Sequence, residues 1–419
     1  MNEIFERLAA GTSLVLMGLC GAFLLVRFVR VLRGQEKADG LERERAFAPQ
    51  EEMAAAALAC LLSRLALFVL AYIMAKLLGL AQGGFFSSLE AAWTHWDAHH
   101  YIGIARDGYT AVGDERLRLV FFPLYPWLMR LLAPLTGGSH FASGTLISLL
   151  CASLSASLVY DLAYLHGGRE TARRAAAYFL LSPLSVFLCC VYTESLFIAC
   201  TLATVCLLRG GRPWLAALFG MASALTRMPG VIIAGLFILA FIQRIPERKL
   251  NLRAAIACLG QVLLVFSGLF VYWAVNWLVT GDPMTYLTYQ RENWYQQPGS
   301  FWRSTANTMY YFLIGHEGSD WLWTWGFQLL CMLGIYLLLA FRQKDLPFDL
   351  AAYSFVYVAV VLSPTWLLSG ARYLYALCAL PLLLARLPLG RRGHGALLLC
   401  SGCMLAIWVF GYTIALEVL

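Results

Sequence analysis

The sequence predicts an all-α integral membrane protein, a polytopic helical bundle that crosses the bilayer about twelve times. Its 419 residues are 60% hydrophobic and 13% charged, whereas soluble domains carry about a quarter charged residues. The apolar segments lack the alternation of lipid-facing β-strands. A helix also satisfies its own backbone polar groups in lipid, so helices are the expected spanning elements.

The expected spans are the apolar segments of the chain. In order they are residues 8–31, 53–80, 141–165, 172–191, 195–208, 214–225, 230–242, 254–279, 321–341, 348–362, 373–387 and 396–416. Several are shorter than the roughly 20 residues of a full crossing, so the count is approximate. The chain has no detectable internal repeat, and we expect a single membrane domain over residues 1–419.

Basic residues in the short loops predict the orientation, because such loops stay in the cytoplasm. The basic loop residues are Arg27, Arg30, Arg33, Lys37, Arg43, Arg45, Arg169, Arg173, Arg174, Arg209, Arg212, Arg244, Arg248, Lys249, Arg253, Arg342, Lys344, Arg386, Arg391 and Arg392. One alternating topology puts them all inside, provided that residues 124–135 lie along the outer surface or dip into it. Residues 81–139 and 280–320 then form two long outer loops, the first carrying interfacial helices.

The first outer loop contains polar and aromatic residues directly after a span. Asp97 lies there with Trp96, His100 and Tyr101. A carboxylate at the membrane boundary is partly desolvated, which suits a general base, and aromatic side chains can hold a substrate beside it. An interfacial aromatic belt with its polar residues facing water explains the same spacing. The spacing alone leaves both interpretations open.

A metal site is the other chemistry that this loop suggests. His95, Asp97, His99 and His100 offer imidazole and carboxylate ligands. If the segment is helical, His95 and Asp97 point about 200° apart, so the cluster is not preorganised for one ion. We expect no metal site and no cofactor, although a divalent ion remains an alternative.

Several motifs follow one another along most of the chain. They are Trp96-Asp97-x-x-His100-Tyr101, Phe121-Phe122-Pro123-x-Tyr125-Pro126, Tyr192-Thr193-Glu194, Thr226-Arg227, Gly281-Asp282-Pro283 and Arg372-Tyr373. In this combination the chain resembles the phosphatidylinositol-glycan class V (PIG-V) mannosyltransferases. The lack of extended soluble insertions favours a prokaryotic relative.

The resemblance implies a GT-C glycosyltransferase fold, in which a sugar is taken from a polyprenyl phosphate carrier on the non-cytoplasmic face. It also implies a catalytic acidic residue in the first outer loop, where Asp97 matches. A phosphodiester leaving group is already acidic, so no general acid is needed, unlike in glycoside hydrolysis. Asp97 would deprotonate the acceptor hydroxyl for a direct, inverting displacement.

The leaving phosphate needs a cation near the membrane interface. Arg372 and Arg227 both lie at outer ends of spans, and an arginine buried there without an anion would be costly. Snorkelling to lipid headgroups is the alternative for both. We also expect Tyr192 and Glu194 in the substrate pocket, although Glu194 could instead favour the positive N-terminus of the next helix.

These residues predict a membrane glycosyltransferase, expected to be a mannosyltransferase, with a polyprenyl phosphate sugar as donor and a lipid or cell-envelope glycan as acceptor. The active site would face outward from the cell membrane, or into the lumen of the endoplasmic reticulum in a eukaryote. The alternative is a transporter or flippase of lipid-linked saccharides, which would keep its charged site near the bilayer midplane. The net charge of +7 lies in loops beside membrane lipids and does not imply nucleic acid.

Overall fold

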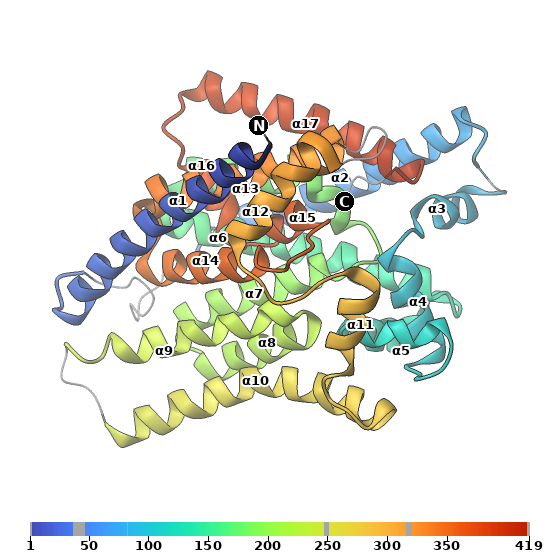
Figure 1. Ribbon diagram of the computed structural model, residues 1–419. Helices are drawn as coiled ribbons and strands as arrows, with labels where there is room; N and C mark the ends of the chain where they lie inside the picture. Colours follow the sequence, from blue (N-terminus) through green and yellow to red (C-terminus); the bar gives the residue numbers. More distant parts are fainter. Residues whose placement is uncertain (1, 37–46, 82, 247–250, 316–320, 417–419) are drawn as a thin grey trace.

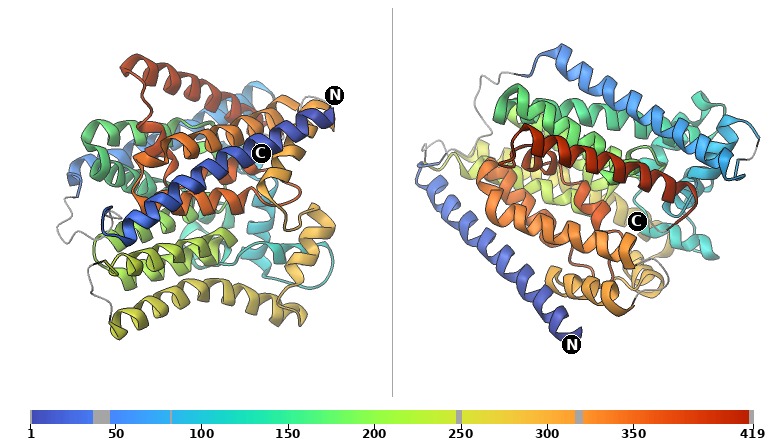
Figure 2. Two further views of the ribbon diagram at one scale, coloured as in Figure 1. Left: turned by 60° about the vertical axis from the view of Figure 1, so that its left-hand side comes forward. Right: turned by 90° about the horizontal axis from the view of Figure 1, so that it is seen from above.

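The computed structural model describes residues 2–36, 47–81, 83–246, 251–315 and 321–416. Over these ranges the chain is helical and contains no β-strand. Figure 1 shows long helices that run in roughly one direction through the molecule, with shorter helices gathered at one end, and Figure 2 shows the same bundle from two further sides. The predicted all-α membrane architecture is confirmed.

Six runs in the described ranges are helical, long and apolar enough to cross a membrane. They contain α1 (Asn2–Leu32), α2 (Gln50–Leu77), α6 (His140–Leu181), α10 (Leu252–Thr280), α13 (Phe327–Arg342) and α17 (Arg391–Thr413). A seventh candidate is bent by 110° between residues 114–120 and 124–136, as expected for a segment that dips into the surface. The chain is therefore a multi-pass membrane protein.

The other predicted spans correspond to shorter helices. These are α7 (Glu194–Arg209), α8 (Pro213–Thr226), α9 (Ala234–Ile242), α14 (Phe348–Val361), α15 (Gly370–Tyr375) and α16 (Leu380–Ala385). Almost every residue of α7 is buried, so the protein itself surrounds this helix. Protein on all sides allows a short or broken helix at membrane depth. The total of about twelve spans stays a prediction.

Helix α6 contains the predicted span 141–165 and the first part of the span predicted over residues 172–191, which the structure ends at Leu181. The run is interrupted at Gly168, whose φ of 70° and ψ of −171° suit glycine and few other residues. Tyr160, before the break, and Arg169, after it, both contact the carboxylate of Glu52. The two arms of α6 therefore flank one point of α2.

Shorter helices form the end of the bundle that contains the two predicted outer loops. They are α3 (Phe85–Trp93), α4 (Asp97–Asp107), α5 (Leu124–Leu132) and α11 (Thr285–Trp294), seen at the right of Figure 1. The second of these loops also contains α12 (Phe301–Tyr310), which packs against α1 and α13. Thr305 of α12 is buried, and its hydroxyl lies 2.9 Å from that of Tyr336.

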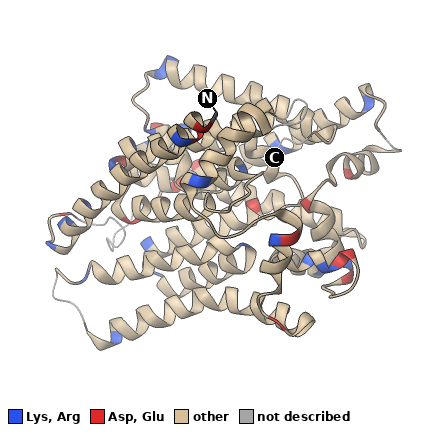
Figure 3. Cartoon of the chain, in the orientation of Figure 1, with Lys and Arg blue, Asp and Glu red and all other residues tan. Residues whose placement is uncertain are grey.

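The predicted cytoplasmic clusters meet at the opposite end. Arg27 donates to the backbone carbonyls of Gln343 and Leu346, and Arg209 forms a buried ion pair of 2.9 Å with Asp349. Charged residues lie mainly at helix ends, and the middle of α10 and of α17 carries none (Figure 3). Outside the described residues lie Lys37, Arg43, Arg45, Arg248 and Lys249.

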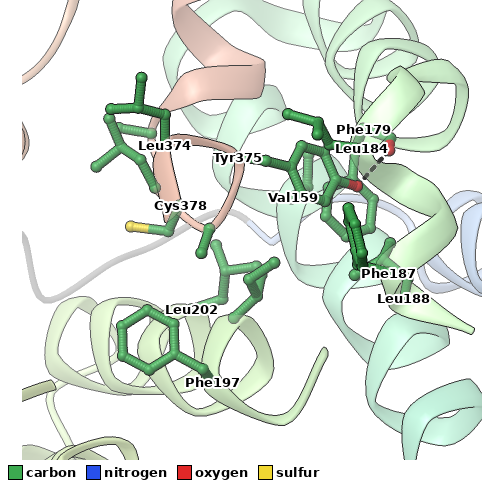
Figure 4. Packing of buried hydrophobic residues seen from close by; sticks show 14 of the residues in the cluster. Val159, Phe179, Leu184, Phe187, Leu188, Phe197, Leu202, Leu374, Tyr375 and Cys378 are labelled. Carbon is green, nitrogen blue, oxygen red and sulfur yellow. Dashed lines mark hydrogen bonds between the residues drawn. The ribbon is translucent and has the colours of Figure 1, made fainter. Parts of the chain in front are cut away.

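Arg64 fixes a break in the centre of the bundle. Its side chain is completely buried in α2 and donates to the carbonyls of Leu180 (2.7 Å) and Ser185 (2.6 Å). Beside it, the Tyr375 hydroxyl donates to the carbonyl of Phe179 (2.7 Å), as Figure 4 shows. Carbonyls at a helix C-terminus lack intrahelical partners and attract cations. These bonds hold the chain that leads from α6 to α7.

The topology can be tested by introducing single cysteines into a variant without the native ones. Val112 is 76% exposed, Glu292 is exposed, and a Cβ added at Gly390 would meet no other atom within 4 Å. We expect an impermeant thiol reagent added outside intact cells to label Val112→Cys and Glu292→Cys but not Gly390→Cys. Equal labelling of Val112→Cys and Gly390→Cys would contradict the predicted orientation.

Candidate active site

A cavity of about 450 Å³ opens at the end of the bundle that carries the two long loops. Segments far apart in the sequence contribute to its wall. Of the predicted site residues, those that line it are Trp96, Asp97, His100, Tyr101, Glu194, Arg227 and Arg372. The eighth, Tyr192, packs its ring 5.0 Å from the guanidinium carbon of Arg372. The structure thus brings all eight together.

Four charged side chains form a connected cluster in the wall. Arg372 donates from Nη2 to Asp97 Oδ2 at 2.8 Å, and its Nε lies 3.2 Å from Glu194 Oε1. Arg227 pairs with the same oxygen of Glu194. The side chains of Arg372 and Glu194 are 5% and 1% exposed, whereas that of Asp97 is 28% exposed. Two cations therefore balance two carboxylates in a largely buried cluster.

Aromatic rings support both guanidinium groups. The ring of Tyr373 lies 4.7 Å from the guanidinium carbon of Arg227 and 5.5 Å from that of Arg372. The ring of Phe187 lies 5.4 Å from the Arg372 group. Cation–π attraction strengthens when the cation is desolvated. The rings therefore limit the movement of both guanidinium groups and leave their positive charges unneutralised.

The backbone before Arg372 is held by a buried glutamine. Gln328 of α13 donates to the carbonyl of Leu367 (2.6 Å) and accepts from the amide of Gly370 (2.6 Å). A Cβ at Gly370 would lie 2.7 Å from the side chain of Leu367, closer than carbon atoms pack. The start of α15, and with it Arg372, is thereby fixed.

Glycine also shapes the turn at Arg227, where α8 ends. A Cβ at Gly230 would lie 2.3 Å from the backbone of Ser223, so only glycine lets the chain fold back this closely. Arg227 itself is extended, with φ −157° and ψ 146°. The change from helix to extended chain directs Arg227 to the cavity.

Asp97 begins α4 directly after a strained residue. Trp96 has φ 46° and ψ −115°, and such a conformation in a residue other than glycine costs about 1–3 kcal/mol and recurs at functional sites. At the other end of α4, Arg130 donates to the carbonyls of Ala105 (2.6 Å) and Arg106 (3.1 Å). Both ends of the helix that carries Asp97 are therefore held.

Several atoms of the charged cluster form no hydrogen bond within the described part of the chain. They include Asp97 Oδ1 and three buried atoms, Glu194 Oε2 and the Nη1 and Nε of Arg372, of which Nε is in ion-pair contact with Glu194 Oε1. Buried polar atoms are normally paired, and an exception calls for an explanation such as a ligand or an unseen water. The cluster therefore has both cationic donors and anionic acceptors that form no hydrogen bond within the described ranges.

His100 and Tyr101 form the neighbouring wall. The imidazole of His100 stacks on Phe121 with ring centres 4.6 Å apart, and burial lowers the pKa of His100 below its usual value of 6.5. The Tyr101 hydroxyl lies 3.4 Å from that of Thr193, and burial raises the pKa of Tyr101. Both side chains are therefore neutral at pH 7.

The described residues contain no group of three histidine, cysteine, aspartate or glutamate side chains placed to hold a metal ion. The four polar residues of the first loop diverge, since His95 packs on Tyr412 while His100 stacks on Phe121. His99 is exposed. That the protein works without a metal stays a prediction of the sequence.

Some residues in or beside the site had no role in the sequence argument. Trp294 lines the cavity from the second outer loop, Phe187 lies beside the guanidinium of Arg372, and Gln328 holds the backbone before it. Gln328 could have been noticed as a polar residue within an apolar segment, where polar side chains tend to be functional. Phe187 and Trp294 have no such signal, because aromatic residues are frequent throughout the chain.

Comparison with known proteins decides the family. The family described as Mannosyltransferase (PIG-V) matches residues 62–290, which is more than half of the chain. The chain belongs to the PIG-V mannosyltransferase family. The matched range contains Asp97, Glu194 and Arg227 and ends before Arg372, so the inclusion of Arg372 in the site depends on its contacts.

Two curated relatives are called GPI alpha-1,6-mannosyltransferase 2. The mouse protein is 33% identical over 153 residues, covering 34% of this chain and 30% of the relative. The human protein is 33% identical over 171 residues, covering 37% and 34%. The match thus spans about a third of these PIG-V relatives. A solved structure, ArnT from Cupriavidus metallidurans bound to undecaprenyl phosphate, aligns with a TM-score of 0.44 and 14% identity over 94% of this chain and 76% of that one.

Burial of His100 predicts a dependence of stability on pH. Because its folded pKa lies below 6.5, folding favours the neutral imidazole, and stability is lost as the pH falls from above 6.5 through the folded pKa. We expect His100→Gln to reduce the drop in melting temperature between about pH 7.5 and about pH 5.5. An unchanged drop would show that His100 does not contribute to it.

Proposed function

We propose that this protein is a membrane glycosyltransferase, a mannosyltransferase by family, which transfers a sugar from a polyprenyl phosphate carrier to an acceptor hydroxyl. The observation that carries the proposal is the 2.8 Å contact between Arg372 and Asp97 at the wall of the cavity. It puts a cation for a phosphate and a base for a hydroxyl side by side. Transfer of a sugar from a phosphate to a hydroxyl requires both the cation and the base.

In the proposed reaction the donor phosphate binds the guanidinium of Arg372, with Arg227 nearby. The acceptor oxygen attacks the anomeric carbon from the side opposite the phosphate, and its proton moves to Asp97. A bond forms between the acceptor oxygen and the anomeric carbon, while the bond from this carbon to the phosphate oxygen breaks with its electron pair. Polyprenyl phosphate leaves, and the configuration of the sugar is inverted.

The contact between Arg372 and Asp97 is compatible with both roles. Asp97 uses Oδ2 for Arg372 and keeps Oδ1 for a proton. Arg372 likewise keeps Nη1. Stabilisation of the charge that develops on the leaving phosphate is the expected task of Arg372.

The proposed location of the reaction is the outer face of the cell membrane, or the lumen of the endoplasmic reticulum in a eukaryote. The cavity opens at the end opposite the basic loops, and basic loops are retained in the cytoplasm. The acceptor would be a lipid or a cell-envelope glycan. Aromatic residues such as Trp96 and Trp294 in the cavity wall suit the apolar faces of sugar rings.

A direct assay separates this proposal from the alternative of a transporter of lipid-linked saccharides. Purified protein in detergent would be incubated with polyprenyl phosphate mannose labelled in the sugar, together with a membrane lipid extract. We expect labelled product and release of polyprenyl phosphate. A transporter has no compartments to connect in detergent and would leave the donor intact.

Replacement of the proposed base should abolish most of the activity. Asp97→Asn keeps the shape but cannot take the acceptor proton, and general base catalysis contributes about 100- to 10,000-fold. We expect turnover to fall by this factor in the transfer assay, while polyprenyl phosphate still binds. Near-normal transfer by Asp97→Asn would remove this residue from the mechanism.

Two substitutions test Arg372 as the phosphate ligand. Lysine keeps the charge but loses the planar guanidinium, so Arg372→Lys should weaken donor use and retain some activity. Arg372→Ala should lose far more, because it also leaves Asp97 and Glu194 without their shared partner. Wild-type donor KM and turnover in both variants would mean that the phosphate has another ligand.

A further inference from the structure

We propose that Glu194 is a positioning residue that joins the guanidinium groups of Arg372 and Arg227 into one phosphate-binding pair. The proposal rests on the proposed function and adds to it the group that holds the two arginines together. Glu194 lies on α7, whereas Arg227 follows α8 and Arg372 lies on α15. The carboxylate therefore connects three separate segments.

The contacts of Glu194 carry this inference. A single oxygen, Oε1, contacts Nη1 of Arg227 and lies 3.2 Å from Nε of Arg372. The carboxylate is 1% exposed, so water screens these interactions little. Two guanidinium groups this close would repel each other without an anion between them. Glu194 provides the anion and sets their separation.

The same contacts leave one nitrogen of Arg372 available. Nε is in ion-pair contact with Glu194 and Nη2 donates a hydrogen bond to Asp97, whereas Nη1 has no partner within the described ranges. The ring of Tyr373 lies beside both guanidinium groups and limits their rotation. Glu194 thus fixes the orientation of Arg372 at the wall of the cavity that Arg372 lines.

A role at the N-terminus of α7 explains less of the geometry. Glu194 is the first residue of this helix, where a carboxylate interacts favourably with the helix dipole. That interaction needs no arginine partner, yet Oε1 contacts two of them. If Glu194 acted only through its negative charge, it would repel the phosphate, and removing that charge would strengthen phosphate binding. A positioning role predicts the opposite effect, weaker phosphate binding.

The test compares Glu194→Gln, Glu194→Asp and wild type in donor KM, turnover and competition by polyprenyl phosphate. Hydrogen bonds to charged groups contribute about 1.5–3 kcal/mol, or about ten- to a hundred-fold. We expect Glu194→Gln to raise the donor KM and the inhibition constant of polyprenyl phosphate by this factor, with a smaller change in turnover. Glu194→Asp keeps the charge and should recover part of the loss.

A double-mutant cycle tests whether the residues act as a unit. If Glu194 positions Arg227, then Arg227→Ala should weaken polyprenyl phosphate binding much less in the Glu194→Gln background than in wild type. The matched control is Asp349→Asn, which breaks another buried ion pair, that of Arg209 at the opposite end of the bundle. It should lower the melting temperature while leaving the donor KM unchanged.

Two results would overturn the inference. They are tighter or unchanged polyprenyl phosphate binding by Glu194→Gln, and additive effects in the cycle. If Glu194→Gln does not fold, Glu194→Asp alone decides, since a wild-type donor KM in a variant with a shortened carboxylate contradicts a positioning role. Failure of the proposed function is distinguishable, because the wild-type protein would then transfer no sugar.

Discussion

The ion pairs of Arg372 are the interaction on which the rest of the site depends. Burying a charge is costly unless it is paired and hydrogen-bonded, and Arg372 is 4% exposed. Its two carboxylate partners, Asp97 and Glu194, come from α4 and α7. To satisfy the buried cation, the ends of three segments must converge, and the cavity lies where they meet.

The convergence requires helices that stop inside the bundle. Glu194 follows a broken segment, Arg227 lies where α8 ends, and Asp97 follows the strained Trp96. Non-helical backbone at membrane depth is tolerated where protein buries it or where it lines a cavity. Protein buries almost all of α7, and buried donors such as Arg64 satisfy the carbonyls at the breaks. The breaks that complicate the count of spans thus place the polar groups of the site.

Composition was sufficient to predict the class of fold, and the motifs pointed to residues that the structure brings together around one cavity. Apolar length indicates helices in a membrane directly, and Asp97 and Arg372 stood out as charges at the ends of spans. The pairing of Glu194 with both arginines could not be predicted, since 33 residues separate Glu194 from Arg227 and tertiary packing decides the contact. The same applies to Arg64, whose partners are backbone carbonyls and leave no pattern in the sequence.

A structure with polyprenyl phosphate bound tests the central claim most directly. Cryo-electron microscopy of the purified protein with this lipid would locate the phosphate. The account predicts phosphate oxygens within hydrogen-bond distance of the Arg372 guanidinium, with Arg227 beside it and Asp97 facing the remaining cavity. A phosphate bound at the opposite end, between Arg27, Lys344 and Arg386 where a second polar pocket lies, would contradict it.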